Sequence, residues 1–174
     1  MCRSFPPRLA ALLALLAPAG AFASPPQLFL PNRNAVANAN IILPATITKL
    51  NDMDFGCITS STAGTAILDS NTGAVTTTGG VTFAGCLPHA AQFAAVSPSK
   101  TVVRITIPNK PVTLTRVGGT ETMTIDTWTI NGATTRNVVA HQTFSFQIGG
   151  TLHVGANQVE GVYNGNFDVI LSYN

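Results

Sequence analysis

The stretch GVYNGNFDVILSYN, residues 161–174, alternates between apolar and polar side chains almost to its last residue. From Tyr163 onward the odd-numbered positions are Tyr163, Gly165, Phe167, Val169, Leu171 and Tyr173, with mostly polar residues between them. A repeat of two residues is typical of a β-strand with one buried face and one solvated face. The sequence therefore predicts a strand over Val162–Tyr173.

The rest of the chain favours the same fold class. Thr, Val and Ile are frequent, and Gly or Pro interrupts the chain often, which disfavours helices. Nine further short β-prone runs are predicted: Ile41–Lys49, Met53–Ile58, Ala74–Thr78, Val81–Cys86, Val102–Pro108, Val112–Val117, Thr122–Ile130, Thr143–Ile148 and Leu152–Ala156. The apolar register shifts near Asp126–Thr127, which predicts a β-bulge there. Ten short strands predict an all-β fold, an immunoglobulin-like antiparallel Greek-key β-sandwich.

The first 23 residues have the features of a secretory signal peptide. Arg3 and Arg8 give a basic start, an apolar run follows, and AFA at 21–23 is a small-x-small cleavage site. Cleavage between Ala23 and Ser24 is expected to leave 151 residues, enough for one domain with a substantial core. The mature chain then carries seven basic and seven acidic residues. This sparse, balanced charge predicts no nucleic-acid binding, and no remaining segment is apolar enough for membrane insertion.

Cysteine usage agrees with export, because disulfides persist in oxidising compartments. Cys2 is expected to leave with the signal peptide, so that Cys57 and Cys86 remain. One Cys57–Cys86 disulfide is the simplest pairing. A metal pair is the alternative, but no second pair of ligands has suitable spacing.

Residues 24–39, SPPQLFLPNRNAVANA, differ in character from the chain that follows. They contain three prolines, several asparagines and a loose alternation of Leu28, Leu30 and Val36. Two interpretations are open, a flexible N-terminal extension or a strand that pairs with a partner. Residues 40–174 then form the sandwich domain.

No constellation of residues indicates catalysis or metal binding. His89, His141 and His153 occur singly, without the spacing of metal-binding histidines. Asp52 and Asp54 lie two residues apart, as a carboxylate pair requires, but the rest of a calcium loop is absent. We therefore expect no catalytic residue, no metal, no cofactor and no enzymatic activity.

The C-terminal stretch resembles the C-terminal motif of chaperone–usher pilins. Counted from Asn174 as the first residue, Tyr173 is second and Gly161 is fourteenth, with an alternating strand between them. In that family a periplasmic chaperone first binds this strand, which later borders the site filled by a neighbouring subunit's donor strand. The resemblance implies a subunit-assembly strand that contains Gly161, Tyr163, Phe167, Val169, Leu171 and Tyr173, and a candidate donor strand that contains Leu28, Leu30 and Val36.

The donor segment departs from the pilin pattern, because Asn32 and Asn34 stand where bulky residues would continue. A sandwich completed by its own chain is therefore an alternative to strand exchange.

The mature chain also resembles a group of secreted bacterial proteins, the family of domain of unknown function 4402. The matching stretches are ITKLNDMDFG (47–56), FQIGGTLHVGANQVEGVYNG (146–165) and residues 167–174. This resemblance implies a pilin-like or adhesin-like sandwich.

These features together predict a non-catalytic structural subunit of a fimbria-like surface fibre, assembled by β-strand addition. The expected partners are copies of itself or homologous subunits, a periplasmic chaperone and an outer-membrane usher. The expected location is the periplasm, cell surface or fimbrium of a Gram-negative bacterium. The alternative is a monomeric secreted or periplasmic binding module for carbohydrate, with Trp128 as an exposed platform instead of a core residue.

Overall fold

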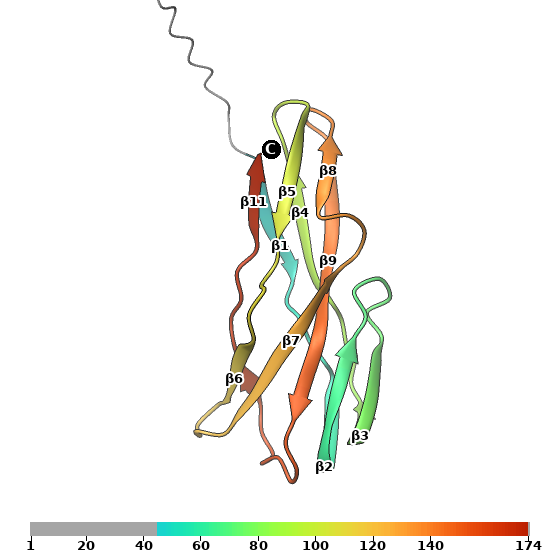
Figure 1. Cartoon of the computed structure of the whole chain (residues 1–174), viewed down its shortest axis with the longest axis vertical. Coiled ribbons are helices and arrows are strands. Elements are labelled where there is room, and N and C mark those ends of the chain that lie inside the picture. The colour runs from blue at the N-terminus through green and yellow to red at the C-terminus, as the bar shows by residue number, and fades with distance from the viewer. Residues whose placement is uncertain (1–44, 174) are drawn as a thin grey trace, which may run out of the picture. The chain divides into compact units, whose positions relative to one another are not determined.

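The computed structural model describes residues 45–173, in which every regular element is a β-strand and every ladder is antiparallel (Figure 1). The strands are β1 (Thr46–Asn51), β2 (Cys57–Leu68), β3 (Val75–Gly85), β4 (Ala91–Val96), β5 (Thr101–Thr106), β6 (Val112–Arg116), β7 (Thr122–Ile130), β8 (Thr135–Val138), β9 (Thr143–Val154), β10 (Tyr163–Asn164) and β11 (Ile170–Tyr173). No helix within this range is long and apolar enough to cross a membrane.

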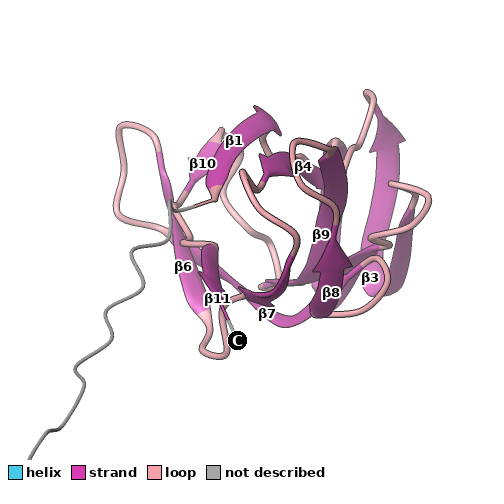
Figure 2. Cartoon of the chain, turned by 90° about the horizontal axis from the view of Figure 1, so that it is seen from above, coloured by secondary structure: helices cyan, strands magenta, loops and turns pink. Residues whose placement is uncertain are grey.

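The strands form two sheets that pack as a sandwich (Figure 2). The larger sheet has the order β1-β4-β9-β7-β6-β10, with β2 paired to β9 and β3 paired to β2. The smaller sheet has the order β11-β5-β8. Many neighbours are not consecutive in the chain, so the connections cross between strands as in Greek-key folds. The predicted fold class is confirmed.

Strand β9 is the centre of the larger sheet. One side of it pairs with β7. The other side pairs with β4 as far as Ile148 and with β2 from Gly150 onward. Gly149 lies at this change of partner, where an added Cβ would sit 2.2 Å from the Leu68 carbonyl oxygen. Only glycine allows β2 to approach so closely. The two runs that the sequence predicted over residues 143–156 are therefore one continuous strand with a change of partner at Gly149.

The core has two clusters of buried side chains. The strand residues of the first all belong to the larger sheet, and the second also includes residues of the smaller sheet. The first is built around Leu68, Ile125 and Leu152. The second contains Ala91, Phe93, Ile105, Phe146 and Ile148. In the second cluster Phe146 is 0% exposed and stacks on Phe93, with ring centroids 5.4 Å apart.

Two local predictions are confirmed. Cys57 and Cys86 form a disulfide with their Cα atoms 5.3 Å apart, where β2 begins and β3 ends. The register between β7 and β9 shifts between Asp126 and Thr129, which is the expected bulge.

Several strand predictions were wrong in detail. The runs over 74–78 and 81–86 are the single strand β3, and residues 53–56 contribute only an isolated bridge. Strands β4 and β8 and most of β2 were not predicted. The C-terminal run is two short strands instead of one.

Candidate functional site, an open edge of the sandwich

The C-terminal segment passes from one sheet to the other. Strand β10 pairs with β6 in the larger sheet, and β11 pairs with β5 in the smaller sheet. Residues 165–169 between them belong to no ladder in the described chain, so the predicted continuity over Val162–Tyr173 was wrong. The predicted alternation nevertheless holds, because the large odd-numbered side chains from Tyr163 to Tyr173 are half-buried and the even-numbered ones are exposed.

The opposite segment of the chain explains the break. Thr106 pairs with Ile170 and Thr115 pairs with Asn164, so eight residues, 107–114, lie opposite five, 165–169. This longer segment contains Pro108 and Pro111. Proline has no backbone N–H to donate to a ladder, so the unequal lengths and the prolines together prevent pairing.

Strands β1 and β11 are edge strands of the two sheets, since each pairs on one side only within residues 45–173. Figures 1 and 2 show both strands at the same side of the sandwich, β1 in the larger sheet and β11 in the smaller. An edge strand presents unpaired N–H and C=O groups to any further strand. We call this side, formed by β1, β11 and residues 165–169, the open edge.

The inner face is incompletely covered at the open edge. Ile47 of β1 pairs with Ala95, which is 2% exposed, yet Ile47 itself is 36% exposed. Leu171 of β11 pairs with Ile105, which is 1% exposed, yet Leu171 is only half-buried. Cross-strand partners share a face of the sheet, so both side chains point inward and still contact solvent. The core is therefore left open between the two edge strands.

Lys49 also lies on the inner face of β1, because it pairs with the buried Phe93. It remains exposed and forms an ion pair with Asp52. A charge on the inner face of an edge strand disfavours further pairing along that strand.

Residues 165–169 are held by their side chains. The Phe167 ring packs on the indole of Trp128, with ring centroids 4.8 Å apart, and Val169 packs against the second core cluster. Trp128 is half-buried against both clusters, and its Nε1–H donates to the Lys110 carbonyl oxygen at 3.1 Å. Trp128 is thus a core residue, and this packing counts against a sugar platform.

Gly161 and Tyr163 lie at the far end of the larger sheet, away from the β11 ladder. Tyr163 pairs with Arg116, and the Tyr163 hydroxyl donates to the Val159 carbonyl at 2.6 Å. Gly161 has φ +150°, and an added Cβ would meet the Arg116 side chain at 2.9 Å. The Arg116 guanidinium donates to Glu121 at 2.6 Å, and this hydrogen bond lowers the pKa of Glu121 to about 2. These residues fix the start of the C-terminal segment.

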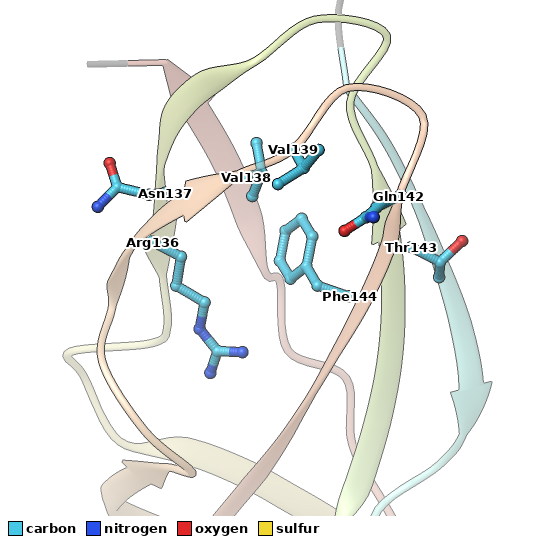
Figure 3. A pocket seen from close by; sticks show the side chains of 7 residues that line it. All are labelled: Arg136, Asn137, Val138, Val139, Gln142, Thr143 and Phe144. Atoms are coloured by element: carbon cyan, nitrogen blue, oxygen red, sulfur yellow. The ribbon is translucent and has the colours of Figure 1, made fainter.

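A hollow of about 130 Å³ lies between β8 and the start of β9 (Figure 3). Val138, Val139 and the Phe144 ring line it, while the Asn137 side chain points away. Arg136 donates to three backbone carbonyls and lies over the Phe144 ring, 6.0 Å from its centroid. The one charge in this hollow is thus engaged in structural contacts.

The isolated polar residues have structural partners. His89 Nδ1 lies 2.8 Å from the Asp52 carbonyl oxygen, and Asp54 accepts from the Gly56 N–H. His153 bonds to Asp126 at 2.8 Å, which lowers the pKa of that carboxyl group. No group of three or more metal-ligating side chains occurs in the part of the chain that the structure describes.

Two sets of predicted residues lie outside the described range. They are the signal cleavage site at Ala23 and Ser24 and the candidate donor residues Leu28, Leu30 and Val36. Sequence reasoning missed the contribution of β1 to the open edge, in particular Ile47 and Lys49.

Comparison with known proteins gives one match. No curated protein and no solved structure matches the chain significantly. A family model described as "Domain of unknown function (DUF4402)" matches residues 45–173, which is the whole described sandwich. The chain therefore belongs to the DUF4402 family.

Proposed function

We propose that this protein is a structural subunit of a fimbria-like surface fibre, in which each subunit receives a strand from a neighbour at the open edge. The observation that carries the proposal is that Ile47 is exposed and Leu171 only half-buried on the inner face, beside residues that are almost fully buried. An added strand would cover both side chains and pair with the free side of an edge strand.

The donor in this proposal is the segment Ser24–Ala39 of another copy or of a homologous subunit. Chaperone–usher pilins are assembled by a periplasmic chaperone and an outer-membrane usher, and we propose the same two partners for this protein. Export to the periplasm or cell surface follows from the proposed signal peptide, and the Cys57–Cys86 disulfide suits an oxidising compartment.

Substitutions on the two faces of β11 test the proposal. Leu171→Lys places a charge where the incoming strand would cover the inner face, and we expect it to abolish fibres on cell surfaces seen by electron microscopy. Ser172→Lys is the matched control, because Ser172 is the exposed neighbour on the outer face and should leave fibres intact. Circular dichroism of both variants would verify that the sandwich still folds.

Deletion of Ser24–Ala39 tests the donor. We expect this variant to fold and to remain monomeric. Fibres of normal length from the deletion variant would refute strand donation, and so would a wild-type protein that stays monomeric when a chaperone and usher are supplied.

A further inference from the structure

We propose that residues 165–169 are part of the surface that receives the incoming strand, and that they become β-strand when it binds. This inference rests on the proposed function. The receiving surface would then extend from Gly165 to Tyr173, about 30 Å of extended chain at 3.3 Å per residue, instead of the four residues of β11.

The first support is that this segment already has the side-chain orientation of a strand. Phe167 and Val169 are half-buried and face the core, while Asn166 and Asp168 are exposed. The segment has this two-residue alternation without any ladder partner in the described chain. It therefore needs only backbone hydrogen bonds to continue β11.

The second support is that the chain's own opposite segment is unsuited to provide those bonds. Residues 107–111, IPNKP, contain two prolines and belong to a longer connection. The backbone groups of residues 165–169 can then find hydrogen-bond partners in a further strand on their open side.

The third support is the chemistry of the two sides of the open edge. The inner face of β1 carries Lys49, whereas the inner positions from 165 to 173 are Gly165, Phe167, Val169, Leu171 and Tyr173. An apolar strand would therefore pair along the C-terminal segment, with β1 as the opposite wall.

The occupant that fits is the Ser24–Ala39 segment of a second copy. It has 16 residues, enough to span positions 165–173, and Arg33 is its only charged residue. It precedes β1 in the sequence, and β1 borders the open edge.

Hydrogen exchange with added peptides tests the inference on the purified chain. A peptide of residues 24–39 should slow the exchange of the amides of both 165–169 and 170–173 by at least about tenfold. A peptide of residues 27–31 should protect less of this stretch, because it is too short to span it. A 24–39 peptide with Leu28→Asp and Leu30→Asp is the matched control, and β7 amides serve as the internal reference.

Trp128 provides a second measurement, because it is the only tryptophan and contacts Phe167. Its emission should shift when the long peptide binds and shift less with the short one. Protection of 170–173 without protection of 165–169 would overturn this inference and leave the proposed function standing. Protection of 165–169 before any peptide is added would overturn it as well, and absence of peptide binding would refute both proposals.

Discussion

Removal of the Cys57–Cys86 disulfide is expected to lower the free energy of unfolding by about 3.6 kcal/mol. The two cysteines are 29 residues apart in the chain. The chain-entropy relation for a closed loop of this length gives that value, because the crosslink restricts the unfolded chain. The double variant Cys57→Ala/Cys86→Ala suits the test, since both cysteines are exposed and their loss leaves no cavity.

The structure also predicts which residues become less stable when the disulfide is removed. Strand β2 pairs with β9 only through Gly64–Leu68, so its first residues, 57–60, pair with β3 alone. The register of the hairpin shifts between Ser60 and Gly64, which interrupts the ladder between its two halves. The disulfide links the two strands at this end of the hairpin. Without it, local opening of residues 57–60 and 81–85 should cost less free energy than global unfolding.

Urea unfolding of the wild-type chain and the double variant measures the global effect. Hydrogen exchange of residues 57–60 and 81–85 measures the local one, with the central strand β9 as control. A loss of less than about 1 kcal/mol would refute the entropic argument for this loop. Unchanged exchange of the hairpin end would show that β3 pairing alone holds it.

Three further changes have definite expected outcomes. Phe146→Ala should cost about 3–5 kcal/mol in urea unfolding, because a fully buried ring leaves a cavity; a cost below about 2 kcal/mol would contradict the packing. Gly149→Ala should destabilise by more than the ordinary effect of a strand alanine, because its Cβ would overlap the β2 backbone; unchanged stability would contradict this. Glu121 has its pKa lowered from 4.5 to about 2 by Arg116, so its stabilisation is present above about pH 4.5 and lost as the pH falls toward 2. Glu121→Gln should remove that component of the acid unfolding curve, and an unchanged curve would contradict it.

Sequence patterns predicted strands well where side chains alternate clearly. The bounds of β7, Thr122–Ile130, agree with the prediction, including the bulge. Strand β4 was missed because its run AQFAAV is rich in alanine, which has little β-propensity and packs here only through tertiary contacts. Strand β2 was missed because Ser and Thr dominate its first half, and it is stabilised by pairing on both sides at its second half.

The open edge was only partly predictable from the sequence. The alternation of the C-terminal segment indicated its inner face, but the strand that each half pairs with depends on the topology of both sheets. Pro108 and Pro111 are the signal that could have located the break, because a segment with two prolines is a poor ladder partner. The exposure of Ile47 follows from the edge position of β1, which its own sequence does not reveal.

The edges of the described sandwich differ in how well they could receive a further strand. Strand β8 carries Arg136 over the inner aromatic rings, and β1 carries Lys49 on its inner face. Strand β3 is uncharged, but Gly79 has φ +66° and bends it at mid-length. Inward charges and bends are the devices by which edge strands avoid pairing. The C-terminal segment over 165–173 has neither on its inner face, so among these four edges it is the one at which strand addition meets the least resistance.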